Sequence, residues 1–119
     1  LRKAEDMFDW AISSNLEPSL ESFNKIISVA ARYGDKAAAE TWLRKVYEVG
    51  LTPDSPVFSA AISAAGKDND LHLARKWFEE AKESGVQLEV SAWNAIIDAA
   101  ARSSDLQTAE ETFWEMQQA

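Results

Sequence analysis

The stretch LESFNKIISVAARYGDKAAAETWLRKVYEVGLTPD (residues 20–54) decides the fold, because its pattern returns at a constant interval along the chain. Phe23, Phe58 and Trp93 are spaced 35 residues apart. The same spacing relates Ile27, Ile62 and Ile97, then Asp35, Asp70 and Asp105, and finally Ala39, Ala74 and Ala109. So many coincidences at one offset, without gaps, indicate an internal repeat.

The repeat divides the chain into units of two helices each. A half-unit covers residues 1–19, full units cover 20–54 and 55–89, and a nearly complete unit covers 90–119. In the second unit, apolar residues follow helical spacing on both sides of a break at 67–70, which predicts two antiparallel helices. A single helical hairpin cannot bury its apolar face alone, so the units must stack into an all-α solenoid.

Capping residues agree with these helix boundaries. An aspartate recurs where each second helix should begin, at Asp35, Asp70 and Asp105. Aspartate at this position accepts hydrogen bonds from the free N–H groups of the first turn. Gly50 and Gly85 follow the second helices and suit a left-handed cap. We expect Ser55 to cap the next first helix, with Pro56 in its first turn.

The composition limits the possible partners. The chain of 119 residues has no cysteine, which excludes disulfides and thiolate metal sites, and no apolar run approaches the ~18 residues of a membrane span. Its net charge is −8, and residues 90–119 carry five acidic side chains against one basic one. This balance disfavours a strong electrostatic grip on phosphates. Since the chain begins without Met, we expect a segment of a longer protein, with 1–19 as the second helix of a preceding unit.

The unit resembles the pentatricopeptide repeat family over essentially the whole chain. The resemblance lies in the aromatic residue followed by asparagine, the isoleucine pair, the basic residue before a Gly-Asp turn, the central alanine of the second helix and the Gly-x-x-Pro-Asp ending. The tetratricopeptide repeat has a period of about 34 and would drift out of register. The resemblance implies a right-handed α-solenoid that binds single-stranded RNA, usually in mitochondria or chloroplasts, during RNA processing, stabilisation or translation.

The resemblance also implies which residues read bases. In this family the fifth and last residues of a repeat contact one base. The fifth positions are Asn24, Ser59 and Asn94, and the last positions are Asp54 and Glu89. Asn24 with Asp54 matches the combination for uracil, Ser59 with Glu89 suggests guanine, and Asn94 suggests a pyrimidine.

The helical geometry supports these positions independently. If Phe23 and Ile27 face the core, Asn24 lies at the edge of a polar face. A basic residue recurs near the end of each first helix, at Arg32, Lys67 and Arg102. These cations could contact one RNA phosphate per repeat, or they could simply complement the helix dipole. In the same way, Asp54 and Glu89 stand where first helices start, so capping also explains them.

The remaining residues indicate a binding protein without enzymatic activity. The aromatic residues expected in the core are Trp42, Trp77, Phe78, Trp93 and Phe113. His72 has no nearby partner pattern and is expected at the surface. No catalytic motif, metal-ligand spacing or phosphate-binding glycine loop occurs, so we expect no cofactor, metal or small-molecule substrate. Two functions stay open: RNA binding, and a protein-interaction scaffold in a larger organellar complex whose acidic surface meets a basic partner.

Overall fold

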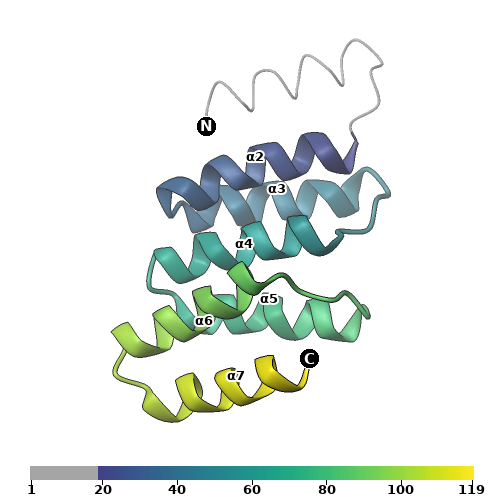
Figure 1. Ribbon diagram of the computed structural model, residues 1–119. Helices are drawn as coiled ribbons and strands as arrows, with labels where there is room; N and C mark the ends of the chain where they lie inside the picture. The colour runs from purple at the N-terminus through teal and green to yellow at the C-terminus, as the bar shows by residue number, and fades with distance from the viewer. Residues whose placement is uncertain (1–18) are drawn as a thin grey trace.

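The computed structural model describes residues 19–119, which form six helices, with no strand in this range (Figure 1). They are α2 (Leu20–Tyr33), α3 (Lys36–Glu48), α4 (Ser55–Lys67), α5 (Leu71–Glu83), α6 (Val90–Arg102) and α7 (Leu106–Gln118). The prediction of an all-α repeat solenoid is confirmed. The predicted half-unit 1–19 lies outside the described residues except for Ser19, which accepts the Ser22 N–H as the N-cap of α2.

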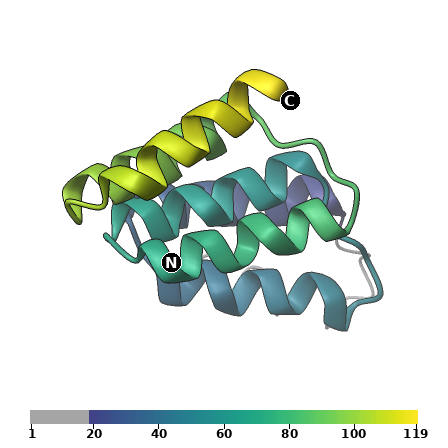
Figure 2. The same cartoon turned by 90° about the horizontal axis from the view of Figure 1, so that it is seen from below.

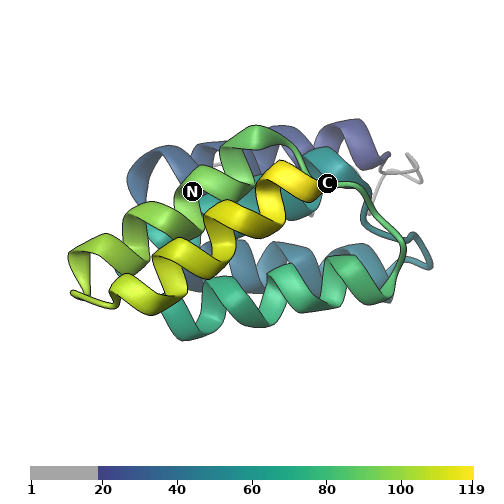
Figure 3. The ribbon, with the colours of Figure 1, turned by 60° about the horizontal axis from the view of Figure 1, so that its bottom comes forward.

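The hairpins stack in chain order, and their first helices form a continuous row. Helix α4 packs directly against both α2 and α6, whereas no comparable packing joins α3 to α5 or α5 to α7. Figure 2 shows that the last hairpin lies at an angle to the first, and Figure 3 shows α2, α4 and α6 following one another on one side. The first helices therefore come closest together and form one shared surface.

The core lies between the two rows of helices and contains most of the predicted aromatic residues. Trp42 is fully buried beside Phe23, with ring centroids 6.4 Å apart. Phe78 is buried edge-on against Trp93 of the next unit, at 4.8 Å. The prediction for Phe113 is wrong, because this side chain is 42% exposed. No hairpin among residues 19–119 covers Phe113 in the way that α6 covers Phe78.

The caps match the sequence with one exception. Asp35, Asp70 and Asp105 each accept a backbone N–H at 3.0 Å in the first turn of a second helix. Gly50 and Gly85 have φ values of 84° and 75°, in the left-handed region that glycine adopts without strain. Ser55, predicted to be an N-cap, is instead the first residue of α4.

Asp54 caps α4 in place of Ser55. Its carboxylate accepts the Val57 N–H at 3.3 Å, and Pro56 lies in the first turn as predicted. A carboxylate caps at least as well as a hydroxyl, and its charge also favours the positive end of the helix dipole. The physical reason for the error is that both candidates are good caps on adjacent residues.

Polar contacts join each unit to the next. Lys36 Nζ lies 2.9 Å from Asp70 and 3.6 Å from Asp68. The Asp70 hydrogen bond is the main cause that raises the pKa of Lys36 above 10.5. Tyr47 donates its hydroxyl to Glu80 at 2.8 Å, and burial, followed by this hydrogen bond, raises the pKa of Tyr47 to about 12. These contacts fix the orientation of neighbouring hairpins.

The second junction repeats the Tyr47 contact with different chemistry. Lys82 and Glu115 stand one repeat after Tyr47 and Glu80, and they form an ion pair of 3.1 Å. The same two positions therefore connect second helices at both junctions, first through a phenol and then through an ammonium group.

Helices α4 and α6 approach each other closely at Gly66. A Cβ at this position would lie 2.8 Å from the backbone oxygen of Ala95 and 3.2 Å from its Cβ. Ala31 occupies the position one repeat before Gly66, and Ala60 the position one repeat before Ala95. Small residues therefore recur where first helices meet.

We expect Gly66→Ala to lower the free energy of unfolding by ~1–3 kcal/mol, because the new methyl group overpacks the contact. Without that clash, alanine would stabilise a helix interior by ~1 kcal/mol relative to glycine. Urea unfolding followed by circular dichroism measures the change. Adding Ala95→Gly should not rescue the variant, since the nearest atom is a backbone oxygen. A more stable Gly66→Ala protein would contradict the close approach.

Because of Asp70, the free energy of unfolding should decrease at acidic pH. The Leu73 N–H and then the Lys36 hydrogen bond hold the pKa of Asp70 below 3.8. A lowered folded pKa means that the contribution is complete above pH ~3.8 and is lost as the pH falls through the folded pKa. Asp70→Asn keeps a good cap but loses the charge, so its stability should fall below wild type at pH 7 and converge with it once the pH is below the folded pKa of Asp70.

The variant Asp70→Ala separates the cap from the charge. It should lose a further ~1 kcal/mol relative to Asp70→Asn, because alanine cannot accept the Leu73 N–H. Urea unfolding at each pH gives both comparisons. A constant difference between wild type and Asp70→Asn across the acid range would show that the carboxylate charge contributes nothing.

Candidate functional site

The shared surface of the first helices contains a cleft of about 420 Å³. Residues from α2, α4 and the start of α6 line it, namely Asn24, Ser28, Ala31, Pro56, Ser59, Ala60, Ser63, Glu89 and Ser91. Three of the five predicted base-reading residues, Asn24, Ser59 and Glu89, are thus brought together. The small side chains of Ala31 and Ala60 leave room for the cleft between the helices.

A second cleft of about 400 Å³ continues the first between α4 and α6. Its lining residues are Ser63, Gly66, Lys67, Ser91, Asn94, Ala95, Asp98 and Arg102. Ser63 and Ser91 line both clefts, so the two adjoin each other. We call the combined surface the polar groove, and it contains a fourth predicted base-reading residue, Asn94.

Asn24 and Asn94 offer amide groups to the groove. Asn24 is half-buried, and its Oδ1 accepts the Ser28 hydroxyl at 3.4 Å. Its NH₂ group donates to no side chain or carbonyl within residues 19–119, and Asn94 is exposed and makes no side-chain hydrogen bond in the same range. An amide carries both donors and an acceptor, which suits the edge of a base.

Ser59 is more deeply placed than its position on a polar face suggests. It is only 2% exposed, and its hydroxyl oxygen accepts the backbone N–H of Glu89 at 3.3 Å. A hydroxyl that accepts in this way still has its own hydrogen to donate. Ser59 therefore links α4 to the start of α6 and can also donate to a ligand above it.

The two predicted last-position residues differ in their surroundings. Asp54 lines neither cleft and is the N-cap of α4. Glu89 precedes α6 without a side-chain cap hydrogen bond, so its carboxylate is available in the first cleft. Asp54 thus acts as a helix cap, which was the alternative role considered for it. Glu89 occupies the equivalent position but makes no cap hydrogen bond with its side chain.

The three recurring basic residues make different contacts. Lys67 Nζ donates to the backbone carbonyl of Arg32, and Arg102 donates to Asn69 Oδ1 at 3.3 Å. Both contacts reach back to the preceding unit, and both side chains also line the second cleft. Arg32 is exposed, lines neither cleft and makes no side-chain contact within the described part of the chain.

The floor of the groove contains residues that the sequence interpretation did not assign to the site. Ala31, Ala60, Gly66 and Ala95 lie where the first helices approach each other. Their signal was present in the sequence, because small residues recur at a spacing of 35 in both pairs of positions. Without the packing, however, nothing distinguished them from other alanines.

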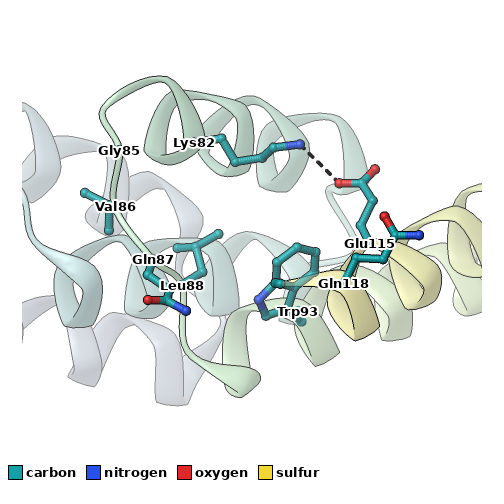
Figure 4. A pocket seen from close by; sticks show the side chains of 9 residues that line it. Lys82, Gly85, Val86, Gln87, Leu88, Trp93, Glu115 and Gln118 are labelled. Carbon is teal, nitrogen blue, oxygen red and sulfur yellow. Dashed lines mark hydrogen bonds and ion pairs between the residues drawn. The ribbon is translucent and has the colours of Figure 1, made fainter.

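A larger cleft, about 500 Å³, lies away from the groove near the end of α7 (Figure 4). Its walls include Leu88 and Trp93, and the ion pair between Lys82 and Glu115 spans it. At the preceding junction Tyr47 occupies the position of Lys82. No predicted site residue lines this cleft.

Within residues 19–119, no group of three or more acidic or histidine side chains is arranged to hold a metal ion. None of the helices in this part of the chain is long and apolar enough to cross a membrane. His72 is exposed, as predicted.

Comparison with solved structures identifies the architecture. The structure superimposes on the PPR domain of Arabidopsis thaliana protein-only RNase P 1 in complex with tRNA (TM-score 0.82, 16% identity), covering 98% of this chain and 61% of that one. It also matches the maize pentatricopeptide repeat protein PPR10 (TM-score 0.82, 24% identity), with 98% and 17% covered.

A third similar structure is nuclear proteinaceous RNase P 2 from A. thaliana (TM-score 0.84, 17% identity), with 98% of this chain and 25% of that chain covered. At these identities the similarity establishes the fold, and the chain spans less than two thirds of each relative. A search of curated protein sequences finds no significant match.

Sequence profiles give the family directly. The profile of a single PPR repeat matches residues 57–86, which lie mostly within the second full unit. The profile of the pentatricopeptide repeat domain matches residues 7–68 and 76–119, which is most of the chain. The chain therefore belongs to the pentatricopeptide repeat family.

Proposed function

We propose that this chain is a non-catalytic module that binds single-stranded RNA along the polar groove. One observation carries the proposal: Asn24, Ser59, Glu89 and Asn94 line the polar groove, although they come from three different units. Each has a hydrogen-bonding group in its side chain. Family membership and the tRNA in a complex of similar fold support the same function.

In the proposed mechanism each unit binds one base, and successive bases of the RNA lie along the row of first helices. Asn24, with Asp54, is proposed to favour uracil, and Ser59, with Glu89, to favour guanine, while Asn94 favours a pyrimidine. The hydroxyl of Ser59 donates to an acceptor on its base, since its oxygen already accepts the Glu89 N–H. Such contacts to base edges are worth ~1–3 kcal/mol each in discrimination.

The cations at the groove are proposed to hold the RNA backbone. Arg32 makes no side-chain hydrogen bond or ion pair within residues 19–119, whereas Lys67 and Arg102 would have to share their donors between phosphate and the preceding unit. Lysine carries three donors and arginine five, so sharing is possible. With about one phosphate contact per unit and a net charge of −8, affinity should be low at physiological salt.

The cellular role follows from the family and is also a proposal. We propose that the chain acts in organellar RNA processing, stability or translation, in a mitochondrion or chloroplast. Any catalytic step would require a domain other than these repeats.

Asn24→Ala should weaken binding of a short single-stranded RNA by about tenfold, because the base edge loses both the donor and the acceptor of the Asn24 amide. Fluorescence anisotropy at low salt, with RNAs that differ at one base, measures the affinity and its preference for uracil. Gln117→Ala is the matched control, since it removes an exposed carboxamide from α7. Equal binding by wild type, Asn24→Ala and Gln117→Ala would disprove base reading at Asn24.

Arg32→Ala and Lys67→Ala should separate phosphate binding from stability. Each should lower the slope of log affinity against log salt by about 0.7, as expected for one contact to single-stranded RNA. Lys67→Ala should also reduce the free energy of unfolding, because Lys67 donates to the Arg32 carbonyl of the preceding unit. If neither variant changes the salt dependence of RNA affinity, Arg32 and Lys67 do not contact phosphate and only complement the helix dipoles.

A further inference from the structure

Helix α7 exposes a pair of aromatic side chains that the stacking of repeats does not fully explain. Phe113 is 42% exposed and Trp114 is 60% exposed. Their rings pack edge to face, with centroids 5.9 Å apart. They therefore form one apolar surface.

The repeat itself shows which of the two a neighbouring unit would cover. Phe113 stands one repeat after Phe78, which is 3% exposed because α6 packs on it. Trp114 stands one repeat after Glu79 and two after Arg44. The side chains of Glu79 and Arg44 are 49% and 64% exposed although further hairpins follow both.

Trp114 thus occupies a position that stays in solvent inside the array. Stacking of another unit accounts for an apolar residue at Phe113, but it gives no reason for a tryptophan at Trp114. Isolated apolar residues are common at protein surfaces. Tryptophan, by contrast, is enriched among the residues that contribute most to binding at protein interfaces.

The charges around the pair define the chemistry of a partner. Helix α7 carries Glu110, Glu111 and Glu115 and has no lysine or arginine. Glu115 pairs with Lys82, but Glu110 and Glu111 form no ion pair within residues 19–119. Both lie one helical turn before Trp114, on the same side of the helix. The aromatic surface is therefore bordered by two carboxylates without a countercharge in the described chain.

We propose that Phe113, Trp114, Glu110 and Glu111 form a docking surface for a basic, amphipathic segment of a protein. Apolar side chains of the partner pack on the two rings, arginine stacks on the Trp114 ring, and arginine or lysine pairs with the carboxylates. This surface is less suited to RNA than the polar groove, because helix α7 has no lysine or arginine to offset the repulsion between its carboxylates and phosphate. The surface belongs to a second helix, whereas the polar groove belongs to the first helices, so the inference stands independently of RNA binding.

The test measures binding of two synthetic helical peptides to the complete 119-residue chain by fluorescence anisotropy. One peptide carries arginines and leucines, and the other has glutamate in place of every arginine. We expect the arginine peptide to bind at least about tenfold more tightly than the glutamate peptide. Trp114→Glu should weaken its binding by about tenfold or more, as at an interface hot spot.

The variants are chosen so that folding does not confuse the result. Trp114→Glu introduces the residue that the preceding unit has at Glu79, so the helix should tolerate it. Tyr33→Glu is the matched control, because Tyr33 is a 74% exposed aromatic residue on α2 and the substitution adds the same charge. Tyr33→Glu should bind the arginine peptide as wild type does, and Glu110→Gln with Glu111→Gln should weaken binding and reduce its salt dependence.

Several outcomes would overturn the proposal. These are no binding of the arginine peptide by wild type, equal binding of the two peptides, equal binding by wild type and Trp114→Glu, and dimerisation in sedimentation experiments that is lost in Trp114→Glu. The last outcome would assign the surface to a second copy of the chain. A loss of RNA affinity in Trp114→Glu would likewise assign it to RNA, whereas failure of RNA binding by every variant would leave the peptide result unaffected.

Discussion

Each helical hairpin of this chain has apolar residues that only a neighbouring hairpin can bury, and the structure depends on this constraint. Phe78 in one unit is covered by Trp93 in the next, and Gly66 lets α4 approach the backbone of α6. Because every unit contributes the same positions, the chain grows by repetition of one contact. The first helices are drawn together, and the second helices remain further apart.

The candidate site is a direct result of this packing. When first helices meet through small residues such as Ala31, Ala60 and Gly66, the polar residues beside them become the walls of a groove. Side chains from different units then lie along one line, as a linear polymer requires. The same row of helices thus supplies both the stability of the array and a surface suited to an extended ligand.

Periodic features could be predicted from the sequence, and contacts between units could not. Asp35, Asp70 and Asp105 act within one helix, so their role as caps followed from local sequence. The depth of Ser59 and the contact of Lys67 with the Arg32 carbonyl depend on how two helices approach each other. Phe113 repeats a core position, yet its exposure depends on whether a neighbour is present. The roles of the site residues in RNA binding stay predictions.

The exchange of Tyr47 for Lys82 makes the two junctions of the array chemically unequal. The first is held by a hydrogen bond from the uncharged Tyr47 hydroxyl, whose pKa is raised to about 12. The second relies on a half-exposed ion pair, which dissolved salt screens. Helix α2 also packs more extensively on α4 than α4 does on α6. In concentrated salt, the α6–α7 hairpin should therefore unfold first, and unfolding should then proceed hairpin by hairpin toward α2.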